Sequence, residues 1–363
     1  MRCLGLDASG AVAYREITVS TKLDAFEVLV DVSYVYIDDR LYERTKGDNS
    51  LWYPGQFPCV VGWEVVGKVA GVGNQVARCK VGDVVVGLLD EGNAGCAAKA
   101  VLQENCLVLK PPKLDSSLAL SSVKAGLLAF DTIHYKMHVE AGDTILVADA
   151  SSDVGTLLAQ LATSLGAFVV MLAHCKESYE SLKKMYGSST CTVLLVESIG
   201  DKVEVWEHKV MKQLLDETDG LGFDHVFHSS IPVTPQDVAR IGESSDDPCY
   251  TIRRLWQQLL IKCMGAHGVL ATTDRYLELD PQESLQLSLR GSSVGFVSEY
   301  PWFLSSTRRS RLIHILEELF SQLETGKLQF PSPVEVHFDT AQSVLANENS
   351  FLEKSKGGLN IRL

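Results

Sequence analysis

The sequence lacks several features, and each absence narrows the class of protein. No stretch approaches the roughly 20 consecutive apolar residues that span a bilayer, and residues 1–17 lack the apolar core of a secretory signal. No long run of Lys or Arg offsets the net charge of −13, which repels the phosphates of nucleic acid and of anionic lipid. We therefore expect a cytoplasmic protein that binds neither membranes nor nucleic acid.

Proline and paired cysteines are also scarce. Only 11 of the 363 residues are proline and 46% are hydrophobic, so the chain can bury a large core and has room for two domains. The nine cysteines are an odd number and include no C-x-x-C pair, which favours reduced thiols over a disulfide framework. Composition thus predicts a globular protein in a reducing compartment.

The pattern of strands and helices changes near residue 125. Short β-rich runs broken by turn residues precede it, such as FEVLVDVSYVYI (26–37). After it, apolar strands such as DTILVADA (143–150) and AFVVMLAHC (167–175) alternate with helical patterns. This order predicts an α/β protein in which a β-rich domain is joined to a doubly wound parallel sheet with helices on both faces.

One segment, residues 229–248, interrupts the alternation. Its sequence, SSIPVTPQDVARIGESSDDP, is polar, acidic and contains proline. A solvated surface insertion accounts for such a composition. A lid or a partner site is the alternative, because the segment follows the carboxyl end of a strand, where cofactors bind in such sheets.

Residues 147–175 have the outline of a dinucleotide-binding turn. A strand, a helix and a second strand contain three positions that the usual fingerprint fills with glycine, and these are here Ala150, Ser152 and Gly155. Asp153 lies where a helix N-terminus presents N–H groups to a phosphate. Two interpretations follow. Ser152 or Asp153 caps the helix of a domain that no longer binds tightly, or a cofactor is still held through the backbone and through contacts elsewhere.

The end of the second strand bears on the choice of cofactor. An NAD site places an acid there for the ribose hydroxyls, whereas an NADP site avoids the acid and supplies a cation. The sequence reads His174, Cys175 and Lys176 before Glu177. This order favours NADPH, and a solvated lysine near a helix start is the alternative explanation.

A longer motif carries a resemblance to a known family. Residues 60–89, VVGWEVVGKVAGVGNQVARCKVGDVVVGLL, match the pattern G-x-E-x-x-G-x-V-x-x-V-G followed by V-G-D-x-V. Residues 139–155, VEAGDTILVADASSDVG, resemble V-x-x-G-x-x-V-L-V-x-x-A-x-G-G-V-G. In these segments the chain resembles the medium-chain dehydrogenase/reductases and, within them, the zinc-free quinone oxidoreductase or zeta-crystallin branch. The resemblance extends over nearly the whole chain.

The resemblance implies a domain organisation and an activity. A GroES-like catalytic domain would comprise residues 1–125, completed by 300–363, and a Rossmann-type cofactor domain would comprise residues 126–299 with the polar insertion at 229–248. Hydride would pass from NADPH to a small-molecule acceptor, a quinone or an enone, and homodimers or tetramers are frequent in the family. Tyr36 and Tyr42 would line the acceptor site. The implied cofactor contacts are Leu128, Ala150, Ser152, Asp153, Val154, Gly155, His174, Lys176, Ser229 and Gly265.

Zinc ligands are missing where zinc-dependent relatives carry them. Trp63 stands where those relatives have a histidine before Glu64. Only Cys96 and Cys106 lie in the region of the four closely spaced cysteines of their structural site. We expect no metal, and we expect Glu64 to be a structural hydrogen-bonding residue. Few catalytic residues are then needed, because the cofactor carries the hard chemistry.

Three substitutions weaken the cofactor site relative to the family pattern. Tyr36 replaces an asparagine, Leu128 a threonine and Leu359 a basic residue, and loss of such a hydroxyl or cation costs about 1–3 kcal/mol each. Two main hypotheses remain. The chain is an NADPH-dependent reductase, or it is a catalytically weak or inactive descendant that serves as a nucleotide-binding or interaction module. A zinc alcohol dehydrogenase is a third, and the missing ligands disfavour it.

Overall fold

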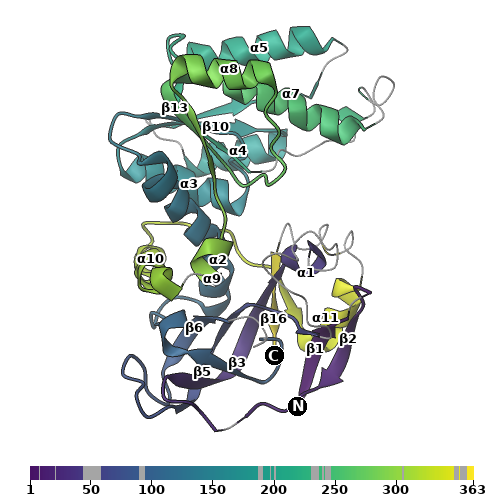
Figure 1. The fold of residues 1–363 in the computed structure, drawn as a ribbon, viewed down its shortest axis with the longest axis vertical. Helices are drawn as coiled ribbons and strands as arrows, with labels where there is room; N and C mark the ends of the chain where they lie inside the picture. The colour runs from purple at the N-terminus through teal and green to yellow at the C-terminus, as the bar shows by residue number, and fades with distance from the viewer. Residues whose placement is uncertain are drawn as a thin grey trace. The chain divides into compact units, whose positions relative to one another are not determined.

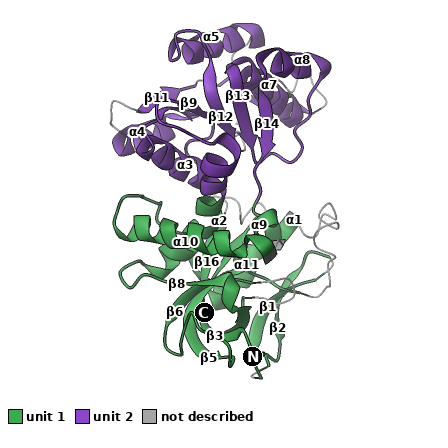
Figure 2. Ribbon diagram, turned by 60° about the vertical axis from the view of Figure 1, so that its left-hand side comes forward, with its two compact units in different colours: residues 1–127, 299–363 green, residues 128–298 purple. Residues whose placement is uncertain are grey.

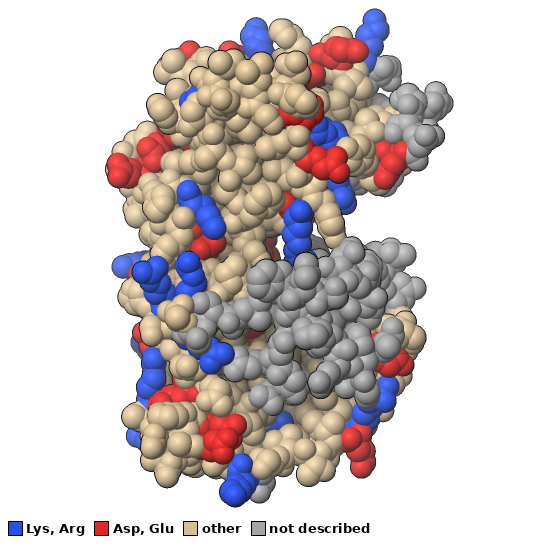
Figure 3. Space-filling view, viewed as in Figure 1, with Lys and Arg blue, Asp and Glu red and all other residues tan. Residues whose placement is uncertain are grey.

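The computed structural model describes residues 1–7, 9–20, 22–43, 59–89, 95–186, 191–196, 198–199, 202–229, 237–238, 241, 247–304, 306–346, 351 and 358–363. These residues form two compact units, residues 1–127 with 299–363 (unit 1) and residues 128–298 (unit 2) (Figure 2). Among the helices described, none is long and apolar enough to cross a membrane. Acidic and basic side chains are interspersed over the described surface in Figure 3, so the net negative charge is not gathered on that face.

Unit 1 is built on two β-sheets (Figure 1). The larger sheet has the strand order β15 (Glu335–His337), β16 (Gly358–Arg362), β3 (Glu27–Asp38), β5 (Glu64–Val72), β6 (Val84–Leu88) and β8 (Leu107–Leu109), and β7 (Lys99–Gln103) also pairs with β3. The smaller sheet has the order β2 (Val12–Glu16), β1 (Arg2–Leu6) and β4 (Cys59–Val60). The helices described in this unit are α1 (Arg40–Glu43), α2 (Ser116–Asp131), whose residues 128–131 belong to unit 2, α9 (Tyr300–Leu304), α10 (Arg309–Glu324) and α11 (Phe338–Leu345).

Strand β3 organises unit 1. Its sequence, EVLVDVSYVYID, is rich in the β-branched and aromatic side chains that favour strands. At Gly67 the neighbouring strand β5 comes so close that a Cβ atom would stand 2.2 Å from the carbonyl oxygen of Asp31, so only glycine fits. Near its end β3 also pairs with β16, Asn360 lying opposite Tyr36. These pairings fix the position of Asp38, the last residue of β3.

Unit 2 contains a six-stranded parallel sheet. Its strand order is β11 (Cys191–Leu195), β10 (Phe168–Ala173), β9 (Thr144–Val147), β12 (Phe223–His228), β13 (Met264–Thr272) and β14 (Ser293–Phe296). The helices that connect the strands lie on both faces of the sheet (Figure 2). They are α3 (Asp153–Ser164), α4 (Lys176–Met185), α5 (Val203–Asp216), α7 (Pro248–Lys262) and α8 (Pro281–Arg290). The predicted α/β fold, a doubly wound parallel sheet joined to a β-rich domain, is confirmed.

Burial on both faces explains the sequence of the central strands of unit 2. All but the first residue of β10, FVVMLA, is buried, as a parallel strand covered by helices on both sides requires. Because all six strands are parallel, their carboxyl ends meet at one edge of the sheet. β9 lies between β10 and β12, where the strand order reverses, so the residues that follow these three strands lie at the topological switch point.

Candidate active site

The turn between β9 and α3 is a tight strand-to-helix connection. A Cβ atom at Gly155 would stand 2.0 Å from the carbonyl oxygen of Asp149, which leaves no room for a side chain. This is the role of the third glycine of a dinucleotide fingerprint, which lets the helix pack closely on the strand. Ala150, at the first glycine position, is fully buried, and its carbonyl oxygen accepts a hydrogen bond from Thr156 Oγ1 at 3.1 Å. The turn therefore closes without glycine at position 150.

Ser152 caps helix α3. Its backbone is extended (φ −72°, ψ 158°), its Oγ accepts a hydrogen bond from the N–H of Gly155 at 3.0 Å, and the same hydroxyl donates to the carbonyl oxygen of Asp149 at 2.8 Å. Asp153 is the first helical residue, where its negative charge favours the positive end of the helix dipole. Val154 follows in the first turn, whose amides have no acceptor within the helix. Ser152 is thus the capping residue, and Asp153 adds negative charge beside the amides.

Two side chains join the carboxyl ends of β9 and β12. Ser229 Oγ donates a hydrogen bond to Asp149 Oδ2 at 2.6 Å, and Asp149 is buried. The pair lies at the switch point between the two strands, where open α/β sheets bind their ligands. Sequence reasoning singled out Ser229 and missed Asp149, although an acid directly after the apolar run TILVA was the available signal.

His174 and Lys176 follow β10, the strand on the other side of β9. His174 Nε2 bonds to the carbonyl oxygen of Ala148 at 2.8 Å, and its ring meets that of Trp256 edge-on with centroids 5.2 Å apart. Burial lowers the pKa of His174, so the ring is neutral at neutral pH. Lys176 is exposed and begins α4, whose N-cap is Cys175. Lys176 therefore carries the positive charge at this strand end.

Gly265 lies away from these residues. It is the second residue of β13, level with the start of β12, and a Cβ atom at Gly222 would stand 2.7 Å from its nitrogen. Since β13 runs parallel to β9, its carboxyl end is Thr272, whose Oγ1 lies 3.1 Å from Nδ1 of His228. Burial lowers the pKa of His228 to about 4, which leaves that ring neutral as well. The structure thus brings His228 and Thr272 to the edge with Ser229 and places Gly265 at the opposite edge.

Most of the polar insertion, namely residues 230–236, 239–240 and 242–246, lies outside the described residues. Within it, Asp237 is buried and accepts a hydrogen bond from the N–H of Ile199 at 2.8 Å. Asp247, near its end, caps α7 by accepting a hydrogen bond from the N–H of Tyr250 at 3.0 Å. Two acids of the insertion therefore have structural roles within unit 2.

The aromatic candidates of unit 1 are buried. Tyr36 is 6% exposed, and its hydroxyl covers Gly358, where a Cβ atom would stand 2.0 Å from it. Tyr42 is 8% exposed, donates a hydrogen bond to the carbonyl oxygen of Leu345 at 3.1 Å and packs against Phe351 with ring centroids 5.5 Å apart. Both side chains are therefore almost completely buried.

Leu128 and Leu359, two of the departures from the family pattern, are also buried. Leu359 belongs to the hydrophobic core of unit 1. Leu128 lies in α2, and its carbonyl oxygen accepts a hydrogen bond from Thr132 Oγ1 at 2.8 Å. Each leucine therefore contributes apolar packing where the family pattern has a polar side chain.

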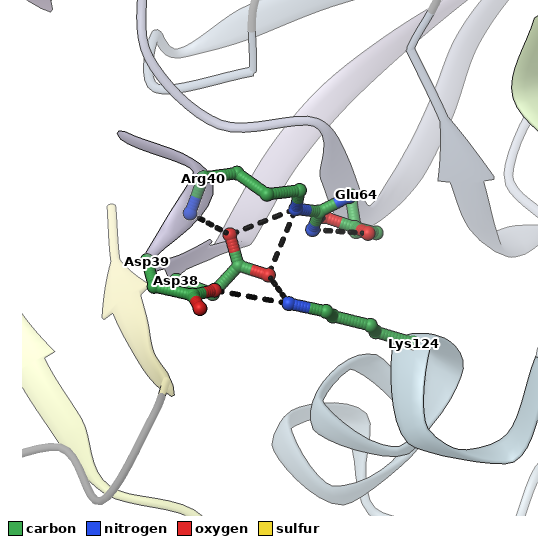
Figure 4. A network of polar contacts seen from close by, with 5 residues as sticks. All are labelled: Asp38, Asp39, Arg40, Glu64 and Lys124. Atoms are coloured by element: carbon green, nitrogen blue, oxygen red, sulfur yellow. Dashed lines mark hydrogen bonds and ion pairs between the residues drawn. The ribbon is translucent and has the colours of Figure 1, made fainter. Parts of the chain in front are cut away.

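A network of charged side chains, shown in Figure 4, lies at the end of β3. Arg40 Nε donates hydrogen bonds to both carboxylate oxygens of Asp38 at 2.8 Å, and its Nη2 donates to both oxygens of Glu64 at 2.7 and 2.8 Å. Lys124 Nζ, from α2, donates to Asp38 Oδ2 at 2.7 Å and to Asp39 Oδ1 at 3.0 Å. Asp38 and Glu64 are fully buried, Arg40 is 5% exposed, and the Lys124 side chain is 20% exposed.

The two buried carboxylates of this network differ in acidity. Burial by itself raises the pKa of Asp38, but the charges of Arg40 and Lys124 outweigh it and hold that pKa at about 2. Burial raises the pKa of Glu64, and the nearby charge of Asp38 adds to the rise while Arg40 opposes it. In the part of the chain that the structure describes, two cations bond to Asp38 and one bonds to Glu64, so a proton that enters the network goes to Glu64 first.

Sequence reasoning missed most of this network. It expected Glu64 to be a structural hydrogen-bonding residue, which the bonds from Arg40 confirm. It did not single out Arg40 or Lys124, because Lys124 lies 86 residues from Asp38 in the sequence and no local motif connects them. Within the described residues, no group of three or more His, Cys, Asp or Glu side chains is arranged to hold a metal ion.

Comparison with known proteins gives consistent matches. Residues 24–113 match the alcohol dehydrogenase GroES-like domain. Quinone oxidoreductase-like protein 1 of Mus musculus is 30% identical over 268 residues, which cover 73% of this chain and 72% of the mouse protein. Among solved structures, an alcohol dehydrogenase superfamily protein from Novosphingobium aromaticivorans has a TM-score of 0.76 at 18% identity, and Escherichia coli quinone oxidoreductase complexed with NADPH has 0.73 at 16% identity. Both alignments cover 100% of each chain, and at such identities they show the fold.

Proposed function

Because this chain belongs to the medium-chain dehydrogenase/reductase superfamily, in its quinone oxidoreductase branch, we propose that it transfers hydride from NADPH to a quinone or another electron-poor carbonyl compound without zinc. In this proposal residues 1–125 and 300–363 form the catalytic domain, and residues 126–299 hold the cofactor. The observation that carries the proposal is the β9–α3 turn at the switch point of the sheet, where Gly155 packs under the carbonyl of Asp149.

The residues of the turn fit a dinucleotide. The close packing at Gly155 positions the first turn of α3 at the edge of the sheet, and a pyrophosphate would accept hydrogen bonds from the amides of Asp153 and Val154. Ser152 already takes the N–H of Gly155, so the cradle has fewer donors than a glycine-rich loop. Asp149 and Asp153 add two acidic side chains beside it. We therefore expect binding that is weaker than in a relative with glycine at positions 152 and 153.

Lys176 supports the choice of NADPH over NADH. A cation at the first position of a helix is unfavourable, because the helix dipole is positive there. Local structure therefore gives no reason for a lysine at this place, whereas a 2′-phosphate bound at the end of β10 would. When bound, the reduced nicotinamide supplies the hydride. We keep the proposal that the rings of Tyr36 and Tyr42 flank the acceptor, and that Leu128 borders the nicotinamide.

The test is calorimetric titration of the purified protein with NADPH and with NADH. We expect micromolar binding of NADPH and weaker binding of NADH. Lys176→Gln should weaken NADPH binding about tenfold and leave NADH binding unchanged, since it removes one charge pair with the 2′-phosphate. Lys184→Gln, in the last turn of the same helix, is the matched control. No binding of either nucleotide, together with recovery of binding in Asp153→Gly, would refute the reductase and support a disabled phosphate site.

We also propose a homodimer through the edge strand β14. This strand pairs with β13 on one side and ends the described sheet on the other. Phe296 on β14 is 51% exposed, and Leu285 and Leu289 on the neighbouring helix α8 are 51% and 78% exposed. An unpaired edge with apolar side chains beside it is a place where a second copy can add its own strand.

A further inference from the structure

Lys124 joins the buried part of the charged network to the surface of unit 1. Its side chain is 20% exposed, and of its two carboxylate partners Asp38 is fully buried whereas Asp39 is 50% exposed. An ammonium group carries three N–H donors. The hydrogen bonds to Asp38 and Asp39 use two of them and fix the direction of the third.

Glu299 lies beside the same network. It is 4% exposed, and its Oε1 has no hydrogen-bond partner among the described residues. The charge of Glu299 raises the pKa of both Lys124 and Arg40. A buried carboxylate oxygen without a partner is costly, so this atom is suited to accept a hydrogen bond from a ligand or from water.

Burial also decides what Lys124 can do. Taken alone, burial would lower the pKa of Lys124, but the charges of Asp38, Asp39 and Glu299 outweigh it and raise that pKa well above its ordinary value. The group therefore stays an ammonium at neutral pH and is a poor proton donor. It is well suited to stabilise negative charge on a neighbouring oxygen.

From this geometry we propose that Lys124 is a catalytic residue whose remaining N–H binds the carbonyl oxygen of the acceptor and stabilises the negative charge that develops on it. Glu299 accepts a hydrogen bond from a hydroxyl of the same acceptor or of its reduced product. Asp38 and Asp39 act as positioning residues for the ammonium, and Arg40 holds Asp38 in place. This inference rests on the proposed reductase function.

Reduction of an enone acceptor at this site would add two electrons and two protons to it. A bound nicotinamide cofactor would supply the hydride that forms a C–H bond at the β-carbon of the acceptor, and would itself be oxidised. The π electrons of the C=C bond move towards the carbonyl, and the oxygen becomes an enolate next to the Lys124 ammonium. A proton from water then completes the reduction, and Lys124 keeps its own protons throughout.

The test that does not depend on NADPH uses 4-nitrophenol, whose visible absorption band appears on deprotonation. The purified protein is titrated with it at a pH where the free phenol is mostly neutral. We expect the bound phenol to show the phenolate band in the natural protein and in the surface control Lys99→Met, and to lose it in Lys124→Met. A phenolate band of equal strength in Lys124→Met would overturn the assignment.

A second variant covers the case in which Lys124→Met does not fold. Glu299→Gln removes the negative charge beside the ammonium and keeps its shape, so 4-nitrophenolate should bind severalfold more tightly. An unchanged or weaker affinity would overturn the assignment of the site.

Steady-state reduction of 1,4-benzoquinone with NADPH separates this inference from the proposed function. We expect Lys124→Met to lower kcat about 100-fold while the Kd for NADPH is unchanged, and Lys124→Arg to restore part of the rate. Equal rates in Lys124→Met and the natural protein would leave the reductase intact and refute the role of Lys124. Capture of phenolate by a protein that oxidises no NADPH would refute the reductase and leave the anion site standing.

Discussion

Removal of Arg40 should destabilise unit 1 in a way that depends on pH. Among the described residues, Arg40 is the one cation bonded to Glu64 and one of two bonded to Asp38, and the side chains of Arg40, Asp38 and Glu64 are almost completely buried. Arg40→Met leaves the two carboxylates without this partner. Breaking a buried pair in this manner costs about 3–5 kcal/mol. For a unit of this size such a loss lowers Tm by about 10 °C.

The pH dependence follows from the two carboxylates. In the natural protein the pKa of Asp38 is depressed to about 2, so its contribution to stability is present above its ordinary pKa near 4 and is lost as the pH falls towards 2. The pKa of Glu64 is raised, so its contribution is present at low pH and is lost as the pH rises through its folded value. Without Arg40 the pKa of Glu64 must rise further. The variant should therefore be closer in stability to the natural protein at pH 5 than at pH 8.

The assay is urea unfolding followed by tryptophan fluorescence at pH 5, 6.5 and 8. Arg78→Met is the matched control, because Arg78 pairs with Glu317 at the surface, where the side chains are 43% and 54% exposed. Such a pair contributes about 0–1 kcal/mol and should show no comparable pH dependence. A loss below about 1 kcal/mol for Arg40→Met, or the same loss at all three pH values, would show that the buried network does not carry this energy.

Three further predictions concern unit 2. Gly155→Ala forces the new Cβ atom to within 2.0 Å of the carbonyl oxygen of Asp149 and should lower the free energy of unfolding in urea by about 1–3 kcal/mol. Gly71→Ala is the control and should have little effect, because the nearest atom to its Cβ would lie at 3.5 Å. Equal effects would contradict the close packing of the turn. Ser152→Ala should lower the free energy of unfolding by about 1 kcal/mol, because the helix cap is lost. The same variant should bind NADPH more tightly in calorimetry, because the N–H of Gly155 no longer bonds to the serine hydroxyl. Weaker binding would mean that the hydroxyl contacts the nucleotide. Phe296→Arg should convert the proposed dimer to a monomer in light scattering. Leu221→Arg is the control and should leave the dimer intact, because Leu221 is 81% exposed and far from β14 in the sequence. A monomeric natural protein would refute the edge-strand proposal.

The β9–α3–β10 unit could be read from the sequence because its signals are local. The apolar runs have strand length, the helix has apolar residues at helical spacing, and Gly155 lies at a fixed distance from the strand that precedes it. Such a pattern predicts that the two strands run parallel with the helix packed against the sheet between them, since these connections have one handedness. It also gives the edge of the sheet at which ligands bind.

Residues that are distant in the sequence and meet only in the folded protein have no such local signal in the sequence. Asp38 and Lys124 meet only because β3 and α2 pack in the same unit, and a lone lysine in an apolar helix is not distinctive. The prediction that Gly265 contacts the cofactor came only from the resemblance to the family. Its place in the sheet depends on the irregular register between β12 and the start of β13, which puts residues 264–268 before the regular pairing begins. A sequence pattern does not contain that register.

Strand β16 has a consequence for biosynthesis. It pairs with residues 34–38 of β3 and is the second strand from one edge of the larger sheet, yet it is made after the whole of unit 2. Unit 2 is continuous in sequence and can fold while the ribosome is still translating residues beyond 298. Unit 1 must wait with part of β3 uncovered, so a chain truncated before residue 358 should leave the ribosome with one finished domain and one exposed sheet that chaperones and proteases recognise.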